Sequence, residues 1–148
     1  MKYTEKISNK LNELLEKNYD AEKGYLNAAE NVDSSRLKIF FKNRASDRSE
    51  FAKNLRTEIL SYGQIPEETG TFQGTMHRNW MSLKSLFSSN DEEAILEEAI
   101  RGEQVSYNEY TEILEEDAFA PSTRKMLESQ RQQIQSAINS LMVEEELA

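Results

Sequence analysis

The sequence predicts an all-α fold built from four long amphipathic helices. Apolar residues recur at intervals of three and four over most of the chain, which is the spacing of one helix face. The chain has only five glycines and two prolines in 148 residues, so few positions interrupt a helix. It has no cysteine, which leaves no disulfide framework and no thiolate chemistry.

The first part of the chain predicts two long helices joined by a short turn. The helical period runs over residues 3–32 and again over residues 34–62. Between them, Asp33 and Ser34 supply the turn and the N-cap of the second helix, and Gly63 ends that helix. Each helix would be a rod about 45 Å long.

A break in the helical period follows, and it predicts a long connection. Residues 63–74 include Pro66 and Gly70 and show no apolar repeat. Met76 and Trp80 then share one face of a short helix expected over residues 75–87, which we expect to pack against the bundle.

Two further long helices are expected after this connection. The third long helix, about residues 90–117, is expected to open with a Ser-x-x-Glu capping box at Ser89 and Glu92. The fourth, about residues 122–143, opens after Pro121, and the acidic tail that follows it is expected to fray.

These elements predict a particular bundle topology. If the second and third long helices run parallel, the chain must return along the whole bundle before the third one starts, and residues 63–89 are available for that crossing. This is the ferritin-like four-helix bundle, with a long crossover that carries a short extra helix. We expect one domain over residues 1–148.

The charges are unevenly distributed along the chain. The net charge is −9; residues 91–117 hold eleven acids and one base, whereas residues 36–56 hold seven bases and two acids. We interpret these segments as solvated helix faces whose complementarity favours packing side by side. The negative overall field opposes nucleic-acid binding. No apolar stretch suits a membrane span or a signal peptide, so we expect a cytoplasmic protein that binds neither nucleic acid nor membrane.

Acidic residues on the inner faces are the candidate functional residues. Helical spacing predicts that Glu22 and Glu103 point inward, and Asp47 and Glu50 are three residues apart in the second helix. Ferritin-like di-metal proteins place a Glu on each of two helices and a Glu-x-x-His pair on each of the other two. Here those pairs read Asp47-x-x-Glu50 and Gln130-x-x-Gln133, so the template is half met.

Two interpretations of these residues stay open. In the first, Glu22, Asp47, Glu50 and Glu103 bind iron or manganese, although neutral amides are weak ligands for these metals. In the second, no cofactor is present, and the inner polar groups set the register of the bundle by pairing with arginine and tyrosine side chains, namely Arg44, Arg48, Tyr25, Tyr107 and Tyr110.

The single histidine does not point to catalysis. His77 lies beside Trp80 in the connection, and no serine, cysteine or second histidine completes a nucleophilic set. We therefore assign no catalytic residue and interpret both side chains as structural anchors of the crossover.

Three motifs resemble an uncharacterised bacterial family of ferritin-like four-helix-bundle proteins, a family of unknown function, over nearly the whole chain. The motifs are Gly24-Tyr25-x-x-Ala28-Ala29-Glu30, Gly70-x-x-x-Gly74-x-x-His77-Arg78-x-Trp80, and Glu98-x-x-x-Gly102-Glu103 with Tyr110. The resemblance implies a ferritin-like fold, self-association and a link to bacterial stress physiology, and no reaction.

Three functional hypotheses follow. The first is a non-enzymatic bundle that acts as a homo-oligomer or through a protein partner. The second is a degenerate di-metal carboxylate protein. The third is a carrier of a lipid or small molecule beneath the crossover helix.

Overall fold

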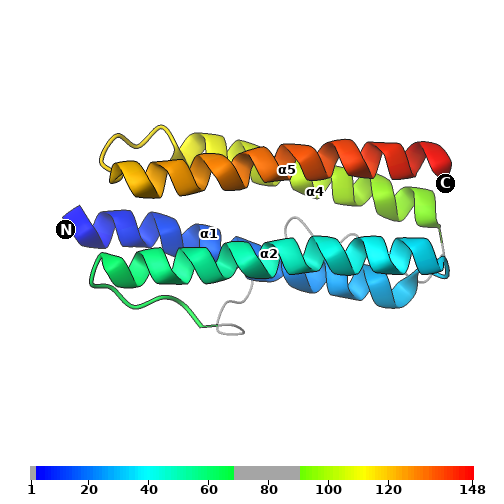
Figure 1. Cartoon of the computed structure of the whole chain (residues 1–148), viewed down its shortest axis with the longest axis horizontal. Helices are drawn as coiled ribbons and strands as arrows, with labels where there is room; N and C mark the ends of the chain where they lie inside the picture. The colour runs from blue at the N-terminus through cyan, green and yellow to red at the C-terminus, as the bar shows by residue number, and fades with distance from the viewer. Residues whose placement is uncertain (1–2, 69–90) are drawn as a thin grey trace.

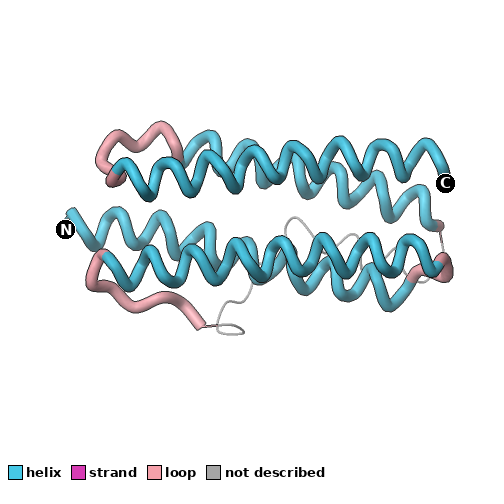
Figure 2. Tube along the Cα trace, in the orientation of Figure 1, coloured by secondary structure: helices cyan, strands magenta, loops and turns pink. Residues whose placement is uncertain are grey.

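The predicted all-α four-helix bundle is confirmed in the residues that the structure, a computed structural model, describes, which are 3–68 and 91–148. Within these residues there are four helices and no strand (Figures 1 and 2). The helices are α1 (Tyr3–Asn31), α2 (Ser35–Ser61), α4 (Glu92–Ile113) and α5 (Pro121–Leu147). The short helix expected over 75–87, with His77 and Trp80, lies outside the described residues, as does the crossover of the carrier hypothesis.

The ends of α2 are set by local signals. Ser34 is its N-cap, and the hydroxyl of this serine accepts a hydrogen bond from the backbone N–H of Leu37 at 3.3 Å. After Tyr62, Gly63 adopts a left-handed conformation with φ of 76°, which ends the helix as glycine commonly does. Both ends agree with the sequence prediction.

The start of α4 differs from its prediction. The N-cap is Asp91, whose carboxylate accepts from the backbone N–H of Ala94 at 3.0 Å, whereas Ser89, the serine of the expected capping box, lies outside the described residues. Glu92 uses its carboxylate elsewhere, accepting from the backbone N–H groups of Asp33 and Ser34 at 3.2 and 3.1 Å. This tertiary contact joins the start of α4 to the turn between α1 and α2.

The C-terminal ends of α4 and α5 also depend on tertiary contacts. α4 stops at Ile113, four residues earlier than expected, and the guanidinium of Arg124 donates to the carbonyl oxygens of Leu114 and Glu116 just beyond it. The expected fraying of the acidic tail is wrong, because α5 continues to Leu147 and Glu144 pairs with Arg36 of α2.

The four helices form two antiparallel hairpins, α1 with α2 and α4 with α5, and the closest backbone approaches lie within the hairpins (Figure 1). The Glu92 contact puts the start of α4 at the start of α2. At the other end, the Tyr62 hydroxyl lies 2.8 Å from that of Thr123 at the start of α5. Figure 1 accordingly shows α2 and α4 running in the same direction.

The expected side-by-side packing of the basic and acidic segments is wrong. Between the hairpins α1 contacts α4 and α2 contacts α5, so the basic helix α2 lies diagonally across the bundle from the acidic helix α4. The neighbour of α4 is α1, whose Lys17 pairs with Glu109 at 2.7 Å and whose Lys6 lies 3.5 Å from Glu116. The apolar faces of the helices determine which helices are neighbours. The acidic residues of α4 and of the turn after it then lie beside lysines of α1.

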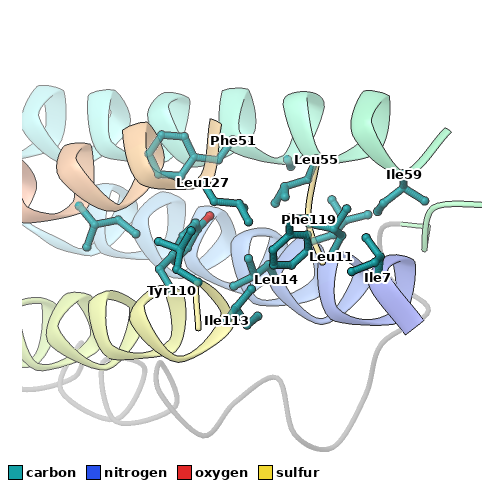
Figure 3. Close-up of a cluster of buried hydrophobic side chains, with 14 of the residues drawn as sticks. Ile7, Leu11, Leu14, Phe51, Leu55, Ile59, Tyr110, Ile113, Phe119 and Leu127 are labelled. Carbon is teal, nitrogen blue, oxygen red and sulfur yellow. The ribbon is translucent and has the colours of Figure 1, made fainter. Parts of the chain in front are cut away.

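Two apolar clusters fill the bundle. The first apolar cluster lies near the start of α1 and contains large side chains, among them Ile7, Leu11, Leu14, Phe51, Leu55, Ile59, Tyr110, Ile113, Phe119 and Leu127 (Figure 3). The second apolar cluster lies toward the other end and mixes large side chains with five alanines: Ala21, Ala28, Ala29, Ala45, Ala99, Tyr25, Val32, Leu37, Phe41, Ile95, Leu96, Ile100 and Leu141. None of the helices in the described residues is long and apolar enough to cross a membrane.

Candidate functional site

Five buried polar side chains lie where the two apolar clusters meet. Asn18 comes from α1, Arg48 from α2, Glu103 and Tyr110 from α4, and Gln130 from α5. We call these residues the polar layer. Each is at most 2% exposed, so their hydrogen-bonding groups must find partners inside the protein.

Arg48 is the centre of the polar layer. Its guanidinium forms an ion pair with the carboxylate of Glu103 and donates a second hydrogen bond to the Oδ1 atom of Asn18 at 2.7 Å. The guanidinium also lies 5.7 Å from the centre of the Phe51 ring, a favourable cation–π distance. Arginine suits this position because its planar group holds several donors in a fixed geometry.

The remaining hydrogen bonds close a ring through all four helices. The side-chain amide of Asn18 donates to the Tyr110 hydroxyl at 3.0 Å, and that hydroxyl donates to the Oε1 atom of Gln130 at 2.7 Å. The amide of Gln130 donates to the backbone carbonyl of Phe51 at 3.4 Å, which returns the chain of bonds to α2. One connected network therefore links every helix of the described bundle.

Burial and charge shift the pKa values of three groups in or beside the polar layer, namely Arg48, Tyr110 and Tyr25. Burial lowers the pKa of Arg48, but the Glu103 carboxylate, together with Tyr25 and Tyr110, outweighs that effect and the net pKa is raised. Burial also raises the pKa of Tyr110 to about 12, and burial together with the Glu103 charge raises the pKa of Tyr25 well above 10.0. The guanidinium stays charged and both hydroxyls stay protonated, so none of these three groups exchanges protons near neutral pH.

A recess connects the polar layer with the surface between α2 and α5. Its inner part is lined by Tyr25, Arg48 and Glu103 and has about 10 Å³ of space, the room of about one water molecule. Its outer part has about 130 Å³ and is lined by Arg44, Asp47, Gln133, Ser136, Ala137 and Ser140. The inner and outer parts share lining residues, so the buried ion pair lies beneath a surface groove.

The structure separates the four residues considered as metal ligands. Glu103 is buried and forms an ion pair with Arg48, one of the arginines named in the second interpretation. Asp47 is partly exposed and pairs with Arg44 of its own helix at 3.0 Å, while Glu50 is exposed. Glu22 was expected to point inward but is only partly buried, because the buried face of α1 runs through Asn18, Ala21 and Tyr25.

Sequence reasoning gave Arg48 too small a role. Six of the eight buried positions of α2 are spaced by four and three residues in turn, and Arg48 occupies one of them: Phe41, Ala45, Arg48, Ala52, Leu55 and Ile59. A charged residue in register with a buried seam needs a buried partner of opposite charge. That spacing could have identified the site and would have placed Asp47 and Glu50 beside the seam.

Together, these features define a four-helix bundle with a buried ion pair and a closed hydrogen-bond network. The model of one protein family, described as a domain of unknown function (DUF2383), matches residues 6–116. The chain therefore belongs to the DUF2383 family. The match spans α1, α2 and α4, including Asn18, Arg48, Glu103 and Tyr110, and ends before α5. A search of curated proteins found no match.

Proposed function

We propose that this protein is a non-enzymatic bundle of ferritin-like topology that acts through its surface, by self-association or by binding a protein partner. The parallel direction of α2 and α4 supports the ferritin-like assignment, because such bundles join their second and third long helices by a crossover. The family resemblance adds a role in stress physiology.

One observation carries this proposal: the guanidinium of Arg48 occupies the interior position next to Glu103. A divalent cation bound to Glu103 would have to displace this permanent positive charge or tolerate it at close range. Glu103 and Asn18 already have partners that satisfy them. The donor set therefore fits a metal ion poorly, and we assign the polar layer to holding the helices in register.

Metal loading tests this proposal. Untagged protein is loaded anaerobically with Fe²⁺ or Mn²⁺ and desalted, and its metal content and melting temperature are measured. We expect no retained metal and an unchanged melting temperature. Glu103→Ala is a poor control, because it leaves Arg48 buried without its partner. Asp47→Asn with Glu50→Gln is the better control, because both side chains are at least partly exposed.

The alternative function is weak iron or manganese binding with oxidase activity. It is favoured by the recess, which brings Asp47, Gln133 and Glu103 to one solvent-connected space. Retention of one or two ions per chain that the Asp47→Asn and Glu50→Gln variant abolishes would establish this alternative and refute our proposal.

The surface part of the proposal needs its own measurements. Light scattering on purified protein tests self-association, and a dimer or larger species is expected. Growth of the source organism with and without the gene, under oxidative and osmotic stress, tests the role in stress physiology.

A further inference from the structure

The outer face of α5 carries no charge over most of its length. Its exposed residues between positions 129 and 143 are all neutral: Ser129, Gln132, Gln133, Ser136, Asn139, Met142 and Val143. The one charged residue in this stretch, Arg131, turns toward α4 and donates to the Thr111 hydroxyl at 3.1 Å. In a chain with 30% charged residues, such a face is unusual.

Five of these neutral residues belong to a stripe of exposed positions that runs along α5. Exposed positions recur at alternating intervals of three and four along the whole helix: Ser122, Lys125, Ser129, Gln132, Ser136, Asn139, Val143 and Glu146. This is the spacing of a seam that a second helix can follow. We call these eight residues the α5 stripe. Lys125 lies near its beginning and Glu146 at its end.

Charge favours this stripe over the acidic outer face of α4 for contact between two copies. Each copy has a net charge of −9, so two copies repel each other over most orientations. The outer face of α4 exposes acids, including Glu93, Glu97 and Glu112. Interface centres are depleted in charged residues, and the middle of the α5 stripe meets that condition.

The charges at the two ends of the stripe determine the relative orientation of the two α5 helices. A parallel pair of α5 helices would place Lys125 beside Lys125 and Glu146 beside Glu146. An antiparallel pair that brings Ser136 of one copy beside Gln132 of the other brings each Lys125 within reach of the other copy's Glu146. Because a two-fold axis makes both contacts identical, this arrangement closes as a dimer.

We infer that the occupant of the α5 stripe is the α5 helix of a second copy of this chain, packed antiparallel about a two-fold axis. This inference rests on the self-association in the proposed function and specifies its surface. The groove between α2 and α5 borders the stripe at Ser136 and gives the contact a concave edge, which Arg44 and Asp47 of α2 also line. A contact of one helix and its edge is small and largely polar, so the dimer belongs to the weak class of interfaces.

The first test places a charge at the middle of the stripe. Sedimentation equilibrium from about 1 to 300 µM covers the range expected of a small interface. We expect a dimer for the unmodified chain, and Ser136→Arg raises the dimer dissociation constant at least about tenfold, because a bulky cation enters the contact from both copies. Asn108→Arg adds the same charge at an exposed neutral position of α4 and leaves the dimer intact.

The second test exchanges the charges at the ends. Lys125→Glu alone and Glu146→Lys alone each place like charges opposite one another and weaken the dimer. The double variant Lys125→Glu with Glu146→Lys restores opposite charges and recovers most of the association. A surface elsewhere on the molecule would not show this recovery. Circular dichroism confirms that every variant keeps its helices, as expected for substitutions of exposed residues.

The outcomes separate this inference from the proposed function. A dimer that survives Ser136→Arg, or charge variants whose effects simply add, overturns the α5 stripe as the interface but leaves self-association in place. A chain that stays monomeric over the whole concentration range overturns both the stripe and the self-association, and leaves only a protein partner in the proposed function.

Discussion

The middle of the bundle and its two ends are held together by different physics. The apolar clusters at the ends consist of side chains that pack wherever a complementary shape is available, whereas the polar layer requires specific partners at specific positions. Sliding one helix along its neighbour by a turn, about 5.4 Å, would still bury apolar side chains. It would break the ion pair between Arg48 and Glu103.

This difference assigns separate roles to the two kinds of region. The clusters supply the favourable free energy of burial, which is non-directional. The polar layer adds little net stability, because taking two charges out of water costs about as much as their attraction returns. Its contribution is to penalise every arrangement of the helices in which Arg48, Glu103 or Asn18 loses its partner.

The largest expected effect comes from breaking the ion pair on one side. Glu103→Leu leaves the Arg48 guanidinium buried without a counter-charge, and we expect it to lower the free energy of unfolding by about 3–5 kcal/mol. Urea unfolding followed by far-UV circular dichroism measures this change. A loss below about 1 kcal/mol would mean that Arg48 escapes to solvent and that the polar layer is not obligatory.

The matched variant removes both charges at once. Arg48→Met with Glu103→Leu replaces the pair by apolar side chains, and we expect its stability to lie much closer to the unmodified chain than that of Glu103→Leu. If the roles described above are correct, this double variant also shows more than one helix arrangement, detected as extra or broadened NMR resonances.

The next largest effect is expected in the first apolar cluster. Leu55 is fully buried, and Leu55→Ala leaves a cavity that lowers the free energy of unfolding by about 3 kcal/mol. Leu60 lies on the same helix but is 61% exposed, so Leu60→Ala is a control with almost no effect. Unlike the double charge variant, Leu55→Ala is expected to keep a single set of resonances.

A smaller effect is expected from opening the hydrogen-bond ring. Gln130→Leu removes the acceptor of the Tyr110 hydroxyl and leaves that buried donor unpaired, at a cost of about 1–2 kcal/mol. Gln104→Leu, at an exposed position of α4, is the control for the side-chain change. Equal unfolding curves for the two variants would contradict the ring as a stabilising feature.

The last expected effect depends on pH and concerns a second buried carboxylate, Asp20. Burial, opposed by Lys23 and assisted by Glu16, raises the pKa of Asp20 from 3.8 to about 7. The folded chain therefore binds more protons than the unfolded chain between these values, and this group's contribution to stability falls as pH rises through them. Asp20→Asn, which stays neutral, is expected to stabilise the protein at about pH 8 but not near pH 4.

Thermal unfolding at several pH values tests this sign. Glu30→Gln, at an exposed position of the same helix, is the control and should show no such pH dependence. A stabilisation of Asp20→Asn that is equal at both pH values would show that the Asp20 carboxyl does not titrate with a raised pKa.

The sequence by itself predicted where helices form, because the signals for helix formation are local. The apolar spacing of three and four, the N-cap at Ser34 and the glycine at position 63 act through hydrogen bonds between residues close in the chain. The early end of α4 and the extension of α5 escaped prediction, because Arg124 and Arg36 reach them from distant positions.

Only the tertiary structure decided which partners the inward-facing polar residues meet. Neighbouring residues on a helix differ by about 100° in direction, so the rotation of α2 about its axis decides that Arg48 points inward and Asp47 does not. The contacts of Ala45, Ala52 and Leu55 with the other helices set that rotation, and it is they that bring Arg48 of α2 to Glu103 of α4. Periodicity defines the buried face of α2, but the partner that meets Arg48 there is chosen by the packing of all four helices.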